Sequence, residues 1–136
     1  MPSTIPRPDE RSDARERALY LLYEAHSKGI SPTDALALQV LAPDELTAAL
    51  VTGVEAHRDR IDSAIAARAT GWSLDRMPVI DLNVLRIATY ELAERPDVPV
   101  AVVLDEAVEL AKRFSTDQSG RFVNGVLSAV AGDLRH

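Results

Sequence analysis

The sequence predicts an all-α fold, a compact bundle of about six or seven helices. Two observations lead to this prediction. Aromatic residues make up only 4% of the 136 residues, so alanine, leucine and valine must fill most of the core, and that composition favours helices over sheets. Apolar residues also recur at the three- and four-residue spacing of helices along most of the chain. With an apolar content of 46%, a chain of this length can bury one core.

The N-terminal residues differ in composition from the rest of the chain. Residues 1–12 carry three of the eight prolines, interspersed with charged residues, which is typical of a flexible arm. From Ala14 onward the apolar residues follow a helical period, and Gly29 ends this first helix. We therefore expect a flexible N-terminal arm over residues 1–12 and a single helical domain over residues 13–136.

Two further helices are expected next. Ser31-Pro32 supplies an N-cap and a proline at the first helical position, which predicts a short helix over about Thr33–Val40. A much longer helix should start near residue 44, with acidic side chains in its first turn, and run to about Ala69. Its apolar pattern lapses near residues 57–59, where we expect a bend.

Three more helices should complete the bundle after a connector over residues 72–77. The first of them starts at Pro78 and is apolar on two faces, so we expect it to be central and buried. The valine-rich segment after Val98 looks like a strand, but its 3.6-residue period continues to Phe114, which favours a helix. Ser119-Gly120 then opens the last helix.

Composition excludes several kinds of chemistry. The chain has no cysteine, which excludes disulfides, thiolate metal sites and cysteine nucleophiles. Its three histidines are scattered without a carboxylate at ligand spacing, so we expect no metal, no cofactor and no enzymatic activity. The longest apolar run, residues 100–104, is far too short to span a membrane, and the N-terminus has no apolar signal core. We therefore expect a cytoplasmic protein.

Two short basic segments stand out against a net charge of −6. Residues 10–17 carry three arginines at the start of the first helix, although acidic residues balance them over residues 1–17. Residues 112–122 carry a net charge of +2 and join a helix end, a polar loop and the next helix start. Helix N-termini bind phosphate, and arginine and aromatic side chains stack on unpaired bases. These segments predict a local RNA contact, although the overall charge opposes a general affinity for nucleic acid.

Two assignments keep alternative interpretations. Phe122 has the inward spacing of the last helix, so it either packs in the core or contacts RNA, and partial exposure allows both. Asp75 and Asp81 lie on either side of the end of the connector. They are either solvated side chains or a docking site for a basic protein partner.

Four motifs follow one another along the chain. They are Arg15-Glu16-Arg17-Ala18-Leu19, Ile80-Asp81-Leu82-Asn83-Val84-Leu85-Arg86-Ile87-Ala88, Asp105-Glu106-Ala107-Val108-Glu109-Leu110-Ala111-Lys112 and Ser119-Gly120-Arg121-Phe122-Val123-Asn124-Gly125-Val126-Leu127. Together they resemble the NusB family of bacterial transcription antitermination factors, with family-like spacing from about Arg11 to Val130. Several motifs in one order are far more specific than any one of them alone.

The resemblance implies an all-helical fold of two small packed bundles and no cofactor. It implies binding to the boxA element of nascent ribosomal RNA together with NusE, a small-subunit ribosomal protein, in a complex that joins elongating RNA polymerase and suppresses termination. The family's RNA contacts fall on positions matched here by Arg11, Arg15, Gln118, Ser119, Arg121 and Phe122. Its partner contacts fall on positions matched by Tyr23, Asp75 and Asp81.

The chain departs from the family pattern at two places. Ser12 and Asp13 interrupt the run of arginines in the arm, and Gln118 stands where the family frequently has an acid. A second hypothesis therefore remains, a helical module that docks on other proteins or forms a homodimer without binding RNA. A third, the N-terminal part of an RNA cytosine methyltransferase, would need a cofactor-binding α/β domain and a cysteine nucleophile that this sequence lacks.

Overall fold

A computed structural model describes residues 8–135 and consists, over those residues, of seven α-helices and one short 3-10 helix. The helices are α1 (Pro8–Lys28), α2 (Pro32–Ala37), α3 (Glu45–Ala56), α4 (Arg58–Arg68), α5 (Val79–Glu94), α6 (Val100–Phe114) and α7 (Asp117–Leu134), with the 3-10 helix η1 (Leu74–Arg76) before α5. The expectation of an all-α fold is confirmed. None of the helices in this part of the chain has the length and apolar character that crossing a bilayer requires.

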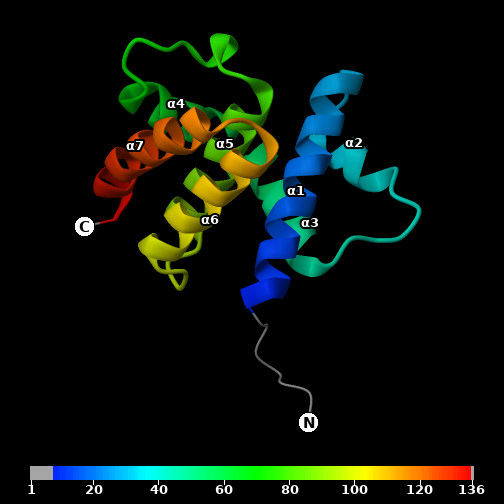
Figure 1. The fold of residues 1–136 in the computed structure, drawn as a ribbon. Coiled ribbons are helices and arrows are strands. Elements are labelled where there is room, and N and C mark those ends of the chain that lie inside the picture. Colours follow the sequence, from blue (N-terminus) through cyan, green and yellow to red (C-terminus); the bar gives the residue numbers. More distant parts are fainter. Residues whose placement is uncertain (1–7, 136) are drawn as a thin grey trace.

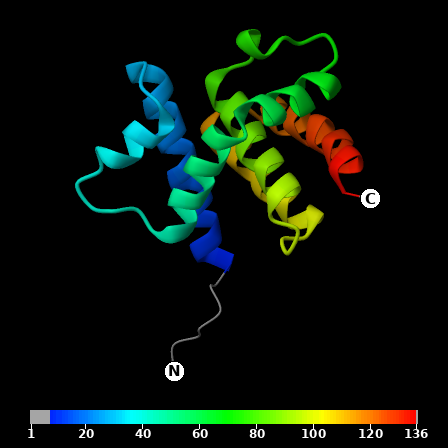
Figure 2. The ribbon, with the colours of Figure 1, turned by 180° about the vertical axis from the view of Figure 1, so that it is seen from behind.

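The helices form two groups that share α5. In the N-terminal group α1, α2 and α3 pack on one another, and in the C-terminal group α4, α5, α6 and α7 do so (Figure 1). Helix α5 also packs against α1 and α3, which joins the two groups. Seen from behind, α3 and α4 cross this junction one after the other (Figure 2). The arrangement matches the predicted pair of small helical bundles.

Helix α5 is buried on nearly all sides, as its two apolar faces predict. Val84 and Leu85 are fully enclosed by the surrounding helices. Its polar residues are enclosed as well, since the Arg86 guanidinium donates two hydrogen bonds to Asp62 of α4, at 2.9 and 3.0 Å. A buried arginine is tolerated where its charge is paired in this way. The centre of the fold therefore combines apolar packing with internal ion pairs.

Helix α3 approaches α5 closely at a glycine. A Cβ atom on Gly53 would lie 2.3 Å from the ring of Tyr90, far inside van der Waals contact. Any side chain at this position would therefore push the two helices apart, and only glycine allows the observed packing.

The boundaries of several elements differ from those expected, among them α2, which ends at Ala37 rather than near Val40. Helix α1 already starts at Pro8, so residues 8–12 are helical rather than part of an arm, while residues 1–7 of the predicted arm lie outside the described residues. Proline suits a first helical turn because its missing N–H would have no partner there. The expected long helix is two helices, separated at His57, whose backbone leaves the helical region. Helix α7 begins two residues early, at Asp117, because Thr116 caps it.

An arginine near the end of the sequence ties the C-terminal group together. Arg135, just after α7, donates hydrogen bonds to the backbone oxygens of Glu91, Leu92, Arg95 and Val98. These carbonyls lie at the end of α5 and in the turn to α6. Those of Glu91 and Arg95 also accept backbone hydrogen bonds, from Arg95 and Val98, whereas Leu92 has no backbone donor four residues on, because residue 96 is proline. The guanidinium therefore acts as a C-terminal cap supplied by a distant helix.

Candidate functional site

The junction of α6 and α7 carries most of the side chains that the sequence singles out. The Thr116 hydroxyl accepts a hydrogen bond from the backbone N–H of Ser119 at 3.0 Å and so starts α7. Gln118 and Arg121 are exposed in the first turns of α7, as expected. The first N–H groups of a helix and its dipole favour negative charge. This junction can therefore hold a phosphate.

Ser119 has a structural role that the sequence did not indicate. Its side chain is buried, and its hydroxyl donates a hydrogen bond to Asp81 of α5 at 2.8 Å. It also lies 3.0 Å from the hydroxyl of Ser115. The Ser119 side chain, one of the predicted RNA contacts, therefore links α7 to α5.

Phe122 is half-buried, which keeps both of its interpretations open. Its ring lies 5.7 Å from the ring of Trp72, with the two planes inclined at 59°. Trp72 is 50% exposed and belongs to the connector before α5. Sequence reasoning did not select Trp72, although the only tryptophan of the chain, placed in a connector, is the signal that could have done so.

Arg15, one of the predicted RNA contacts, is buried between helices and is not a surface cation. Its side chain is 3% exposed and donates two hydrogen bonds to Glu91 of α5, at 2.7 and 2.9 Å, with Glu106 of α6 at 3.7 Å. Burial acts to lower the pKa of the guanidinium, but the hydrogen bond and charge of Glu91, with the charge of Glu106, raise that pKa above its ordinary value. Arg15 therefore joins α1 to α5 and α6 and offers no free charge to a phosphate.

Arg11 lies at the edge of a separate hollow between α1 and α3. It is half-buried there, beside the acidic residues Asp13, Asp44 and Glu45. Nearby carboxylates weaken the attraction of a cation for a phosphate. Arg11 is thus poorly placed to attract a phosphate, whereas Arg17 further along α1, which was not among the predicted RNA contacts, is exposed.

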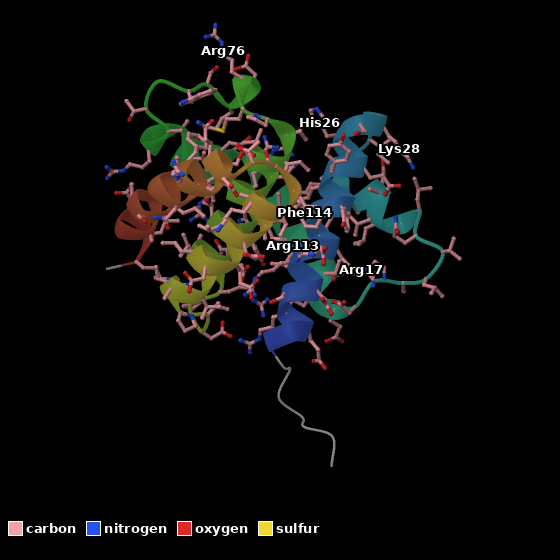
Figure 3. The ribbon with its side chains drawn as sticks, viewed as in Figure 1. Arg17, His26, Lys28, Arg76, Arg113 and Phe114 are labelled. Atoms are coloured by element: carbon pink, nitrogen blue, oxygen red, sulfur yellow. The ribbon has the colours of Figure 1, made fainter. Side chains whose placement is uncertain are left out.

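Arginine and aromatic side chains alternate where α1 meets the end of α6. Tyr20, 53% exposed, meets the ring of Phe114 edge-on with centroids 5.4 Å apart, and the Arg113 guanidinium lies 5.0 Å from the same ring. Arg113 also pairs with Glu16 of α1 at 3.2 Å. Figure 3 shows Arg17, Arg113 and Phe114 on one face of the molecule. We call Arg17, Tyr20, Arg113 and Phe114 the basic–aromatic face.

The groove between α6 and α7 is less favourable for an anionic ligand than the basic–aromatic face, because it contains more acidic side chains. Lys112 and Arg121 line it together with three carboxylates, those of Asp105, Glu109 and Asp117. The basic–aromatic face contains two arginines, with Glu16 as the acidic partner of one of them. The stronger attraction for an anionic, base-bearing ligand is therefore on the basic–aromatic face, whereas Arg121 lies in the α6–α7 groove.

The three expected partner-binding residues differ in their exposure to solvent. Tyr23 on α1 and Asp75 in η1 are exposed, and α1 ends on the same side of the molecule as the connector in Figures 1 and 2. Asp81 is 4% exposed, so it does not belong to an exposed acidic pair. The reason is the hydrogen bond from Ser119, which holds the carboxylate against α7. Within the described residues no cluster of three or more metal-binding side chains is found.

Comparisons with known proteins agree on one family. The family model described as the NusB family matches residues 12–132. The transcription antitermination protein NusB of Saccharopolyspora erythraea is 51% identical over 128 residues, which cover 90% of this chain and 86% of that protein. The protein of the same name from Salinispora tropica is 47% identical, with 89% of this chain and 94% of that protein covered.

Solved structures of the same family share the fold. The structure of T. maritima NusB has a TM-score of 0.81 and 32% identity, covering 96% of this chain and 94% of that one. A structure of the antitermination factors NusB and NusE in complex with dsRNA has a TM-score of 0.78 and 28% identity, covering 90% of this chain and 96% of that one. The similarity thus extends over nearly the whole helical bundle.

Proposed function

We propose, from the premise that this chain belongs to the NusB family, that it is a transcription antitermination factor which binds RNA through the basic–aromatic face. The RNA is a boxA-type element of a nascent ribosomal transcript, bound together with a NusE-like ribosomal protein, and the complex joins elongating RNA polymerase. The similar complex of NusB and NusE with dsRNA supports this assignment. The site of action is the cytoplasm, where such transcripts are made.

The observation that carries the proposal is the chemistry of the basic–aromatic face. Arg113 lies over Phe114, and Tyr20 meets the same ring, so a cation and two aromatic side chains are held together at the surface. Arginines neutralise phosphates, and aromatic rings stack on unpaired bases whatever the sequence. The N-terminus of α7 follows Phe114 by three residues and adds the positive end of a helix dipole, which favours a further phosphate.

The test is a titration of a short boxA-type RNA at two salt concentrations, with and without the ribosomal partner. Binding through phosphates requires the logarithm of the affinity to fall as the logarithm of the salt concentration rises. We expect a clear negative slope, and tighter binding with the partner present. Affinity without any salt dependence would contradict the proposed RNA contact.

The partner surface is proposed to include Tyr23 and Asp75. Both side chains are exposed, and an aromatic ring beside a carboxylate suits a basic protein surface. An Asp75→Lys variant should bind the ribosomal partner more slowly and with less dependence on salt, as calorimetry and stopped-flow association would show. RNA binding by the variant alone should be unchanged.

A protein-docking module without RNA binding is the second candidate. The observation in its favour is the internal pairing of Arg15, which removes one cation from the RNA surface of a chain with a net charge of −6. The same titration separates the two candidates. Partner binding with no RNA affinity at low salt would support the docking module.

A further inference from the structure

One acidic side chain lies against the basic–aromatic face. The Oε1 atom of Glu16, on α1, accepts a hydrogen bond from Nη2 of Arg113, at the end of α6, at 3.2 Å. The side chain of Glu16 is 22% exposed and that of Arg113 is 51% exposed, so the pair lies at the surface. A carboxylate is therefore bound to the same guanidinium that the proposed RNA contact uses.

The packing of α1 against α6 does not depend on this pair. Arg15, buried beside it on α1, lies 3.7 Å from Glu106 of α6, and the Ser12 hydroxyl donates a hydrogen bond to the same carboxylate. These contacts join the two helices beneath the surface. An exposed ion pair held by one hydrogen bond adds little to stability. The Glu16 carboxylate is thus not needed to hold the helices together.

The geometry of the pair leaves room for a second anion. An arginine guanidinium carries five N–H donors in one plane, and Glu16 accepts from one of them. A phosphate bound to the same plane lies within about 7 Å of the carboxylate, where two negative charges repel each other. Near a protein surface this repulsion changes an affinity about three- to fivefold. RNA therefore binds Arg113 at the expense of the contact with Glu16.

The other arginine of the face is free of this restraint. Arg17 follows Glu16 on α1, is exposed, and lies on the same face as Arg113 (Figure 3). The basic–aromatic face thus has one arginine that faces solvent and one whose charge is partly neutralised within the protein. The carboxylate reduces the attraction of the face for anions at one defined position.

We propose that Glu16 is an internal competitor of RNA, and that it limits the affinity of the basic–aromatic face. In the free protein the carboxylate occupies Arg113 in the place of a phosphate, and RNA binding exchanges one anion for the other. The inference rests on the proposed RNA binding and deepens it, because it names a residue that sets the affinity without itself contacting the RNA.

The first test removes the charge and keeps the hydrogen bond. In Glu16→Gln the amide oxygen still accepts from Arg113, so the guanidinium keeps its position. By fluorescence anisotropy, the variant should bind a short boxA-type RNA about three- to fivefold more tightly at low salt. Its salt slope should also be more negative. In the parent, salt weakens the competing pair as well as the phosphate contact, and the two effects partly cancel.

The control removes the same charge elsewhere. Asp59 is an exposed acid of α4, and Asp59→Asn should leave the RNA affinity and the salt slope near their parent values. If Asp59→Asn strengthens binding as much as Glu16→Gln does, the gain is an effect of net charge and the inference is wrong. Circular dichroism should show parent-like unfolding midpoints for both variants, because neither acid is buried.

The second test asks whether Glu16 acts through Arg113. When Arg113 is already alanine, the additional change Glu16→Gln should strengthen RNA binding less than twofold, because the carboxylate has no guanidinium left to occupy. An equal gain with and without Arg113 would overturn the inference.

A third variant separates competition from positioning. Glu16→Ala removes both the charge and the hydrogen bond, and it should strengthen RNA binding as Glu16→Gln does. Weaker binding by Glu16→Ala would mean that Glu16 holds Arg113 in place for RNA, which is the opposite of the inference. Salt-dependent RNA binding by the parent with no gain in Glu16→Gln would overturn the inference alone. An absence of RNA binding by the parent at low salt would overturn the proposed function as well.

Discussion

The arginines of the two basic segments of this chain lie in opposite environments. On α1, Arg15 is enclosed and its charge is taken up by Glu91 and Glu106. At the end of α6, Arg113 stays half-exposed over an aromatic ring and shares its charge with one carboxylate of α1. The difference lies in the surroundings of each arginine. Arg15 faces a buried glutamate, whereas Arg113 is largely surrounded by solvent.

The comparison shows that a basic segment cannot be equated with a binding surface. An arginine that meets a buried glutamate contributes to the stability of the helix packing. An arginine that meets only a surface carboxylate gains little from that pair and remains able to bind a ligand. The following substitutions test whether a charged side chain stabilises the folded protein or remains free to bind a ligand.

Removal of the buried arginine should have the largest effect. Arg15→Ala leaves the Glu91 carboxylate buried without its partner, which costs about 3–5 kcal/mol of unfolding free energy. Denaturant unfolding followed by circular dichroism measures this loss. Arg17→Ala, two residues away and exposed, should change the unfolding free energy by less than about 0.5 kcal/mol. A parent-like unfolding midpoint for Arg15→Ala with weakened RNA binding would place Arg15 among the ligand-binding residues after all.

Removal of the C-terminal cap should have the next largest effect. Arg135→Ala removes the hydrogen bonds to the carbonyls of Leu92, in the last turn of α5, and Val98, in the turn after it, and we expect a loss of about 2–3 kcal/mol. Hydrogen exchange of the amides in the last turn of α5 should accelerate with it. An Arg135→Lys variant should recover part of the stability only, because an ammonium group cannot reach several carbonyls at once.

Removal of the exposed arginine should affect RNA and leave the fold intact. Arg113→Ala should weaken RNA binding on the order of 1 kcal/mol, or about fivefold, and reduce the salt slope by about 0.7–1. Arg60 of α4, with a side chain 75% exposed, provides the control, since Arg60→Ala should alter neither quantity. If both variants change the salt slope equally, the RNA contact is a diffuse charge effect and not a property of the basic–aromatic face.

The smallest effect is expected at low pH. A hydrogen bond from Lys28 lowers the pKa of the Glu24 carboxyl below its ordinary value. The folded protein therefore binds a proton at Glu24 less tightly than the unfolded chain does. The Glu24–Lys28 pair stabilises the fold at pH values above the pKa that Glu24 has in the unfolded chain. This stabilisation is lost as the pH falls through the lowered pKa of the folded protein. When the pH is lowered from about 7 to about 3, the unfolding free energy of Glu24→Gln should therefore fall slightly less than that of the parent. Urea unfolding midpoints at each pH measure this difference.

Local sequence patterns predicted the helices well because a helix depends mainly on residues that are close together in the sequence. The period of apolar residues around Leu85 was enough to predict a buried central helix, and the structure confirms it. The residues of the candidate site were harder to assign because their environment comes from distant segments. Arg15 meets Glu91 across 76 positions and Asp81 meets Ser119 across 38, so neither burial is visible in the pattern around either residue.

Helix boundaries failed for a related reason. The start of α1 at Pro8 and the division of the expected long helix at His57 depend on backbone geometry at single residues. Apolar periodicity does not show the start of α1, because mostly polar residues occupy those positions. Its lapse near residues 57–59 predicted a bend at the right place, but not that one helix ends there and another begins. The basic–aromatic face was missed in part for the same reason, since Tyr20 and Phe114 come together only through the packing of α1 on the end of α6.

The pairing of Arg15 with Glu91 also sets an order of events during synthesis on the ribosome. The 76 positions that separate the two residues correspond to roughly 4–15 s of translation at about 5–20 residues per second. During that interval Arg15 of α1 has left the ribosome, and Glu91, which pairs with it in the folded protein, has not. The N-terminal helices can therefore pack on the C-terminal group only after α5 has emerged, because α5 joins the two groups.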